Sequence, residues 1–296
     1  MADQSTIPTP ATPDVCTFSI LIDGKAIPSE FNILHISVIR ELNRIPAATI
    51  HIQDGNTAKA TFKASNTDYF IPGKKIEIQL GYRANNNTVF KGIIIKHSLK
   101  VRKNTSSLIL ECRHPAIKMT FDLHSRYYTD KKDSDIMEEV ISTYALAKDV
   151  ETTKPALKEL VQYECSDWDF LLCRAEANGQ VVLVEDETIK VLSPALGTEP
   201  VVTVGYGSTL LELDLEIDAR LQSEGIKAST WSSSDQELIS AEAKEPKTTN
   251  NGNLTGTKLA ESIGHKSHEL RHGGTLSQAE LQAWADSRLL KERLAK

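Results

Sequence analysis

Alternation of apolar and polar residues with a period of two dominates the first third of the chain. Residues 17–23 and 48–55 are two short runs of this kind. The first run ends at Asp23, which is followed by Gly24, and the second ends with the pair Asp54-Gly55. Asp-Gly pairs are typical of tight turns between antiparallel strands. More runs follow, separated by Asn-rich or Ser-rich turns, at residues 31–42, 74–82, 88–102 and 106–113. Six or more short strands predict a small barrel or sandwich, because closure hides the edges of a sheet.

A different periodicity begins beyond this region. Residues 133–146 place their apolar side chains on one face of a helix, and residues 159–165 have the pattern of a strand. Residues 180–194 form two apolar runs that predict a hairpin. We therefore expect a small α/β insertion over residues 121–198.

A second helix is expected inside this insertion. Ser166 is followed three positions later by Asp169, a pattern typical of a capped helix start. Trp168 and Leu171 then lie on the apolar side of the helix, and Gly179 predicts its end, since glycine accepts the left-handed conformation there.

Strand patterns return over residues 200–207, 209–220 and 225–231. The last two weakly repeat the N-terminal region: Arg220 is followed by Ala228-Ser229 at the same spacing that separates Arg40 from Ala48-Thr49. We interpret this as a trace of a duplicated barrel.

The C-terminal part combines a polar loop with a final helix. Residues 232–274 are mostly polar, and a helix is expected from Ser277, with Glu280 completing a capping box. The sequence stops at Lys296 without a closing strand. We therefore expect the second barrel to belong to a truncated chain or to be completed by another polypeptide.

Together these patterns predict a mainly β (α+β) protein, in which two small β-barrel domains flank an α/β insertion. The expected parts are a flexible N-terminal arm, a first β-barrel, the insertion and an incomplete second β-barrel with its polar loop and helix, at residues 1–16, 17–120, 121–198 and 199–296, respectively.

Composition excludes several classes of function. The 296 residues include 34 Lys and Arg against 40 Asp and Glu, a formal charge of -6, and no long basic run, so a nucleic-acid partner is not expected. No apolar stretch approaches the roughly 20 residues that a membrane span needs. The first residues also lack the basic start and apolar core of a secretory signal peptide.

One motif points to enzymatic chemistry. Residues 268–272 read HELRH, which matches the HExxH pattern of zinc metalloproteases. On a helix, His268 and His272 share a face as zinc ligands and Glu269 is placed as the general base. Glu292 lies at a spacing where some such enzymes place a third ligand.

Three features argue against this zinc site. Gly273-Gly274 would end a helix at its second ligand, Arg271 places a positive charge beside the metal, and the adjoining polar loop offers little apolar wall. We therefore interpret the segment as a loop leading into the final helix. A zinc-dependent hydrolase stays the alternative function, and incidental metal binding by His265, His268 and His272 stays a lesser one.

The residues around the second helix carry a family resemblance. The stretch LVQYECSDWDFLLCRAEANGQVVLVED, residues 160–186, resembles the hub segment of VgrG, the spike protein of type VI secretion systems. The strands IPGKKIEIQLGY, TVFKGIIIKH and LILECRH are similar to the first barrel of that family, and VTVGYGSTLLELDLEIDAR is similar to the opening of its second barrel. Hub proteins of phage tails and of extracellular contractile injection systems share this layout.

The resemblance implies a structural, non-enzymatic protein without a cofactor. It implies a homotrimer whose barrels form a ring with pseudo-sixfold symmetry, joining a hexameric tube protein to a trimeric needle. Baseplate components, a C-terminal needle domain or tip protein and effectors would be its partners. Such a protein is cytoplasmic during assembly and is then translocated with the injection particle. The needle of the family is absent from this sequence.

The residues we expect to matter are architectural. The resemblance and the helical pattern together assign an anchoring role in the insertion to Trp168, Phe170 and Leu171. Large aromatic residues are expected to anchor the two barrels, namely Tyr82, Tyr206 and Trp231.

Overall fold

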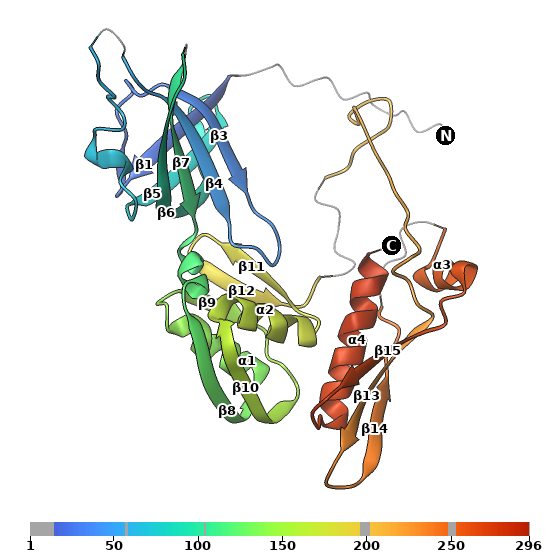
Figure 1. Cartoon of the computed structure of the whole chain (residues 1–296). Helices are drawn as coiled ribbons and strands as arrows, with labels where there is room; N and C mark the ends of the chain where they lie inside the picture. Colours follow the sequence, from blue (N-terminus) through green and yellow to red (C-terminus); the bar gives the residue numbers. More distant parts are fainter. Residues whose placement is uncertain (1–14, 57–58, 104, 196–201, 248–252, 296) are drawn as a thin grey trace. The chain divides into compact units, whose positions relative to one another are not determined.

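The computed structural model describes residues 15–56, 59–103, 105–195, 202–247 and 253–295 (Figure 1). These form two compact units. The N-terminal unit contains Asp14–Arg174 and Val181–Leu192, and the C-terminal unit contains Ala175–Gln180 and Ser193–Lys296. Apart from Val15 and Cys16, the expected N-terminal arm lies outside the described residues.

An antiparallel sheet of seven strands builds most of the N-terminal unit. Its strands pair in the order β2-β1-β5-β6-β7-β4-β3. All the strands expected from the alternating pattern are present. They are β1 (Cys16–Ile22), β3 (Ile33–Ile39), β4 (Ala47–Gln53), β5 (Lys75–Tyr82), β6 (Asn85–Val101) and β7 (Ser106–Arg113), and the short β2 (Lys25–Ala26) is additional.

The core of this sheet follows directly from the alternation. Ile50 and Ile52 of β4 are fully buried, as are Leu108 and Leu110 on the paired strand β7. A short 3-10 helix, η1 (Asp68–Phe70), adds a fully buried phenylalanine to the same cluster. Burial of such side chains stabilises the sheet by roughly 1.5–3 kcal/mol each.

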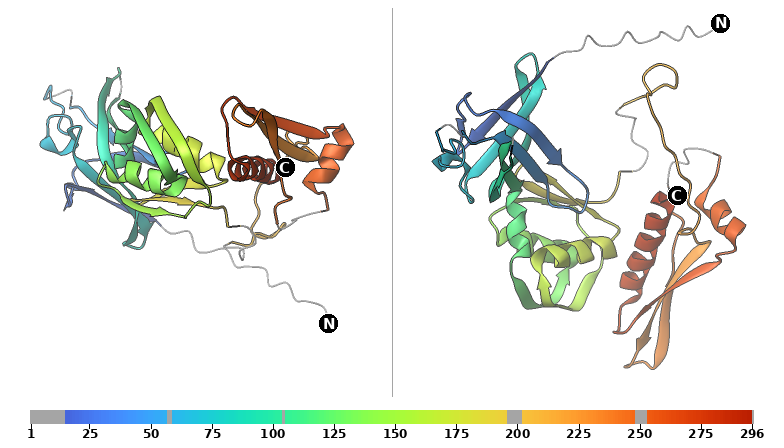
Figure 2. Two further views of the ribbon diagram at one scale, coloured as in Figure 1. Left: turned by 90° about the horizontal axis from the view of Figure 1, so that it is seen from below. Right: turned by 45° about the horizontal axis from the view of Figure 1, so that its top comes forward.

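The sheet is curved in the views of Figure 2, yet its pairing is open. Among the described residues, no ladder joins β3 to β1 or β2, so the order ends at β2 on one side and at β3 on the other. The mainly β class is confirmed, whereas closure of this sheet into a barrel stays a prediction.

An α/β layer follows the sheet in the same unit (Figure 1). β8 and β10 pair with each other, while β12 lies between β11 and β9. The elements are η2 (Pro115–Thr120), β8 (Leu123–Lys132), α1 (Asp133–Ser142), β9 (Ala147–Val150), β10 (Ala156–Ser166), α2 (Asp167–Ala177), β11 (Val181–Glu185) and β12 (Thr188–Leu192). Because the sheet and this layer belong to one compact unit, the expected boundary at residue 120 stays a prediction.

The C-terminal unit is a three-stranded sheet covered by a long helix. Its elements are β13 (Gly225–Ser232), β14 (Glu237–Glu242), α3 (Gly256–Ile263), β15 (Ser267–His272) and α4 (Gln278–Leu294). The strand order is β14-β13-β15, and α4 lies along one face of the sheet (Figure 2). The apolar side of α4 buries Leu281, Ala285 and Leu289 against that face. The expected capping box of Ser277 and Glu280 is present at its start.

Two expectations for this unit were wrong. Within 202–220 the described residues form no strand, only an isolated bridge between Tyr206 and Leu210. Alternation makes a strand only when a neighbouring strand takes up the main-chain hydrogen bonds. Residues 200 and 201 lie outside the described residues. The expected polar loop over 232–274 instead contains β14, α3 and β15. Apolar residues of β14 and β15, Ala241 and Leu270 among them, belong to the same core cluster as those of α4 and β13.

Candidate functional site

The first residue of α2 is the centre of a buried polar network in the N-terminal unit. The carboxylate of Asp167 is fully buried, and both its oxygens accept hydrogen bonds from the guanidinium of Arg126, at 2.6 and 3.1 Å. The amide of Gln162 and the hydroxyl of Tyr144 also donate to it, each at 2.8 Å. The network therefore ties α2 to β8, to β10 and to the chain that follows α1.

This network fixes the charge of Asp167. Burial by itself raises the pKa of a carboxyl group, but the hydrogen bonds from Arg126, Gln162 and Tyr144 outweigh it, and the pKa of Asp167 is lowered. Burial and the hydrogen bond to Asp167 together raise the pKa of Tyr144 to about 12. The carboxylate also lies at the positive end of the α2 dipole, where a negative charge is stabilised.

Apolar and ionic contacts hold α2 on either side of this network. Trp168 and Phe170 are each 5% exposed, and Leu171 is fully buried. Phe170 stacks on Tyr128 of β8 with ring centroids 5.9 Å apart. Further along the helix, Arg174 donates to both oxygens of Asp133 at the start of α1, at 2.6 and 2.8 Å. The sequence signal at the helix start thus marks a segment that is held by buried apolar contacts and by two ion pairs.

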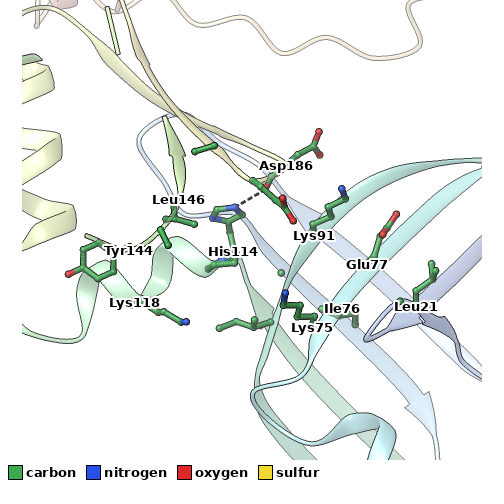
Figure 3. Close-up of a pocket in the computed structure, with 17 residues that line it drawn as sticks. Leu21, Lys75, Ile76, Glu77, Lys91, His114, Lys118, Tyr144, Leu146 and Asp186 are labelled. Carbon is green, nitrogen blue, oxygen red and sulfur yellow. Dashed lines mark hydrogen bonds between the residues drawn. The ribbon is translucent and has the colours of Figure 1, made fainter. Parts of the chain in front are cut away.

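A pocket of about 580 Å³ lies where the seven-stranded sheet meets the α/β layer (Figure 3). Lys75 and Glu77 of β5 line it together with Lys91 of β6, and Lys118 comes from η2. Asp186, from the turn between β11 and β12, lies on another side. The pocket is therefore lined by both cationic and anionic side chains, and its lining has no single sign of charge.

Among the residues that line the pocket, His114 has the side chain most typical of a catalytic group. Both nitrogens of its ring, however, form hydrogen bonds within the protein. Its Nδ1 accepts a hydrogen bond from the main-chain N–H of Ala116, and its Nε2 donates to the carbonyl oxygen of Asp186 at 2.7 Å (Figure 3). Burial lowers the pKa of His114. A neutral imidazole with both nitrogens engaged joins η2 to the β11–β12 turn and has no site left for proton transfer.

The HELRH motif lies on a strand rather than on a helix or in a loop. It forms most of β15, which pairs in parallel with β13. Residues four apart on a strand are roughly 13 Å apart along it, whereas a zinc ion needs ligands at about 2 Å. His268 and His272 therefore do not form the shared zinc site that a helix would give, and Glu269 lies on the opposite face of the strand.

The other proposed ligand, Glu292 of α4, has structural contacts instead. It is 5% exposed, and its carboxylate accepts hydrogen bonds from the main-chain N–H of Ser223 at 3.2 Å and from the Ser223 hydroxyl at 2.5 Å. His268 Nδ1 lies 3.5 Å from the same carboxylate. His272 instead contacts Gly274 and the ring of Trp284.

The described part of the chain has neither a metal-binding cluster nor a membrane-spanning helix. No group of three or more His, Cys, Asp or Glu side chains is arranged to hold a metal ion there. Within the same part, no helix has the length and apolarity needed to cross a membrane.

The aromatic residues expected to anchor the barrels are on the surface. Tyr82 is 58% exposed, Tyr206 is 96% exposed and Trp231 is 54% exposed. Tyr206 lies in a glycine-flanked turn and not on a strand, and Trp231 is on the face of its sheet that α4 does not cover. None of the three anchors a core within this chain, which corrects the expectation.

Sequence reasoning missed the partners of Asp167. Arg126 is 41 residues away, and Tyr144 is 23 residues away. No local pattern connects such positions. No signal in the sequence singles out Arg126 or Gln162, because β8 and β10 carry many other polar residues, most of them exposed.

The fold is shared with proteins of phage tails. A tail protein from Neisseria meningitidis MC58 matches with a TM-score of 0.64 at 16% identity, covering 94% of this chain and 77% of that chain. The 43 kDa tail protein of prophage MuSo2 from Shewanella oneidensis matches with a TM-score of 0.65 at 12% identity, covering 94% and 78%.

A chain of the Francisella PdpA–VgrG complex is also similar. The TM-score is 0.53 at 9% identity, and the match covers 90% of this chain and 42% of that chain. The fold is thus that of VgrG-like hubs related to phage tail hubs, which confirms the resemblance seen in the sequence. No curated protein sequence matches the chain.

A family model matches almost the whole sequence. The model described as the Alg8 N-terminal domain matches residues 12–296, and the chain therefore belongs to this family.

Proposed function

We propose that this protein is the structural hub of a contractile injection machine, of the type VI secretion kind or a related kind. The observation that carries the proposal is the fold, which is shared with two phage tail proteins over 94% of the chain. In this role the protein has no turnover chemistry. It matches the symmetry of a hexameric tube to that of a trimeric needle and transmits load between them.

The side chains of the candidate site support a mechanical role. Asp167 and Asp133 are held in ion pairs that lock α2 against β8 and α1. Both nitrogens of His114 bind the main chain, and Glu292 binds Ser223. Polar groups committed to the fold in this way resist deformation, whereas a catalytic group needs a free position for substrate.

The proposed assembly is a homotrimer. Its two barrel domains, over residues 17–120 and 199–296, alternate around a ring, and the insertion over 121–198 lies between them in sequence. Trp168, Phe170 and Leu171 anchor the insertion. The hexameric tube protein binds on one side, and the needle domain or tip protein binds on the other. Baseplate components surround the ring, and effectors travel with the spike. Assembly takes place in the cytoplasm, and the particle is then translocated.

The zinc-dependent hydrolase gains no support from the described residues, because its two histidines are four positions apart on β15.

Co-expression with the tube protein encoded nearby tests the hub proposal. The chain is expected to be retained on an affinity-tagged tube protein, and the neighbouring reading frames are expected to include a sheath and a baseplate component. Failure to bind the tube protein under conditions in which tube and sheath do associate would contradict the proposal.

A further inference from the structure

Residues 211–217, with the sequence LELDLEI, are the most exposed apolar run of the described chain, and we call them the acidic segment. Leu211 is 98% exposed, Leu213 65%, Leu215 79% and Ile217 57%. In an extended chain these four side chains lie on one face, and the carboxylates between them lie on the other. An apolar row of this kind in water indicates a surface that is buried in an assembly.

The main chain of the acidic segment is unpaired as well. No main-chain hydrogen bond connects residues 211–217 to any other part of the chain that the structure describes. The segment is drawn in Figure 1 as a plain orange trace without a strand arrow. A sequence with the pattern of a strand and free N–H and C=O groups is suited to adding to the edge of a sheet.

An edge of complementary character exists on β6 in the N-terminal unit, and we call residues 96–101 the basic edge. β5 pairs with β6 only as far as Ile93, with two further main-chain bonds at Ile94. Beyond that point, β6 pairs with β7 alone among the described strands. On the other side of β6, the contacts are side-chain contacts, from His97 to the carbonyl of Phe70 and from the Arg102 guanidinium to the carbonyl of Val101.

The basic edge has the same period as the acidic segment and the opposite charge. Lys96 and Lys100 point to one face of β6. In the register of β6 with β7 they lie opposite Glu111 and Ser107, respectively. Leu99 and Val101 point to the other face and are 39% and 55% exposed, respectively. Arg102 extends the basic face beyond the strand.

A strand pair made from these two segments satisfies both faces at once. Side chains that are directly opposite in a sheet lie on the same face, so the antiparallel registers that place Leu213 or Leu215 opposite Leu99 also place carboxylates opposite Lys96 and Lys100. A slip by one residue would place leucine against lysine, so the alternation selects every second register. Pairing of two acidic segments with each other is disfavoured, because it would place carboxylates opposite carboxylates.

We propose that the acidic segment of one copy of this chain adds as a strand to the basic edge of β6 in a second copy. The inference rests on the proposed function, since a ring of copies brings the C-terminal unit of one copy to the N-terminal unit of the next. It names the residues that form one contact of that ring. The exposure of both segments in a single chain follows, because each is covered only by its neighbour.

Disulfide crosslinking between two differently tagged, co-expressed versions of the chain tests this pairing. Cys16, Cys165 and Cys173 are first replaced by serine, while the buried Cys112 is kept. One version carries Leu99→Cys. The other carries a single cysteine at one position from 211 to 217. Directly opposite positions bring Cβ atoms to within about 5.5 Å, close enough for a disulfide after small adjustments.

The expected result is a covalent dimer containing both tags, with a yield that alternates along the segment. Cysteine at one or two of Leu211, Leu213, Leu215 and Ile217 should crosslink severalfold more than cysteine at Glu212, Asp214 or Glu216. The acidic-face cysteines are the matched control, because these positions are also exposed but point away from Leu99. Equal yields on both faces would overturn the inference.

Two further outcomes separate this inference from the proposed function. A sample that is trimeric by mass but gives no mixed-tag dimer would overturn the strand pairing and leave the hub proposal standing. A further version of the chain carries both cysteines. Crosslinking found only within single chains of this version would also overturn the strand pairing between copies, because the acidic segment would then pair with β6 of its own copy. A sample that is monomeric by mass would count against both.

Discussion

Arg126 and Asp167, 41 residues apart in sequence, form a two-point ion pair at the start of α2, with N–O distances of 2.6 and 3.1 Å. The carboxylate is fully buried and the guanidinium is partly exposed. Removal of the cation leaves a buried negative charge that keeps the hydrogen bonds from Gln162 and Tyr144, with His124 Nε2 3.7 Å away. Loss of either member of the pair should therefore be costly.

Arg126→Ala is expected to lower the free energy of unfolding by about 3 kcal/mol, near the lower end for a broken buried pair because Asp167 keeps two other donors. Arg126→Lys should lose less, since it keeps the charge but not the two-point geometry. Urea unfolding measures both. Arg271→Ala, which removes a guanidinium from an exposed pair with Glu269, is the matched control and should change little. Equal effects of Arg126→Ala and Arg271→Ala would contradict this account of the network.

The same network predicts a dependence of stability on acid. The pKa of Asp167 is lower in the folded protein, so its contribution is fully present above the unfolded-state pKa of roughly 3.9. That contribution is lost as the pH falls through the lowered folded-state pKa. Asp167→Asn removes this titration. The stability difference between the wild-type protein and Asp167→Asn should therefore shrink below roughly pH 4. A difference that stays constant from neutral to acid pH would mean that Asp167 does not titrate as described.

Trp168→Ala should destabilise the protein by about 3–5 kcal/mol, because this side chain is 5% exposed and its removal leaves a cavity. Trp231→Ala makes the same chemical change at a side chain that is 54% exposed and should alter stability by no more than about 0.5 kcal/mol. Thermal or urea unfolding of the two variants side by side gives the comparison. An unchanged midpoint for Trp168→Ala would remove this residue from the core.

Zinc should not bind to the HELRH strand with the affinity of a metalloprotease site, because His268 and His272 are separated along β15. Metal analysis of the purified protein is expected to find no stoichiometric zinc that depends on His268. Stoichiometric zinc that is lost in both His268→Ala and His272→Ala, but kept in His265→Ala, would revive the hydrolase.

The strands of the N-terminal sheet could be predicted from the sequence because one face of each strand packs on a shared core, which imposes the alternation even where the partner strand is distant, as β7 is from β4. Ile50 and Ile52 are buried as the period requires, and the start of α2 coincides with Ser166, whose hydroxyl accepts from the main-chain N–H of Asp169. The local rules and the tertiary packing agree at these positions.

The same rules failed where an alternating segment has no partner strand among the described residues, and where the surrounding fold overrides a local motif. Residues 211–217 alternate as regularly as β4, yet they form no strand, because no described strand of this chain pairs with them. The HELRH segment matches a sequence motif that is helical in metalloproteases, but here it is a strand because it pairs with β13. The contact between Arg126 and Asp167 has no local signature, since it depends on how β8 packs against α2.

Mass determination in solution tests the central claim most directly. Light scattering across a range of protein concentrations, repeated at high salt, reports how many protomers associate. The hub account predicts three protomers, with an interface larger than the roughly 1,600 Å² of a standard contact, as in obligate oligomers. The apolar part of that interface should resist salt, since screening weakens exposed ion pairs far more than apolar burial. A particle of 32.7 kDa, the mass of one chain, at every concentration would contradict the account.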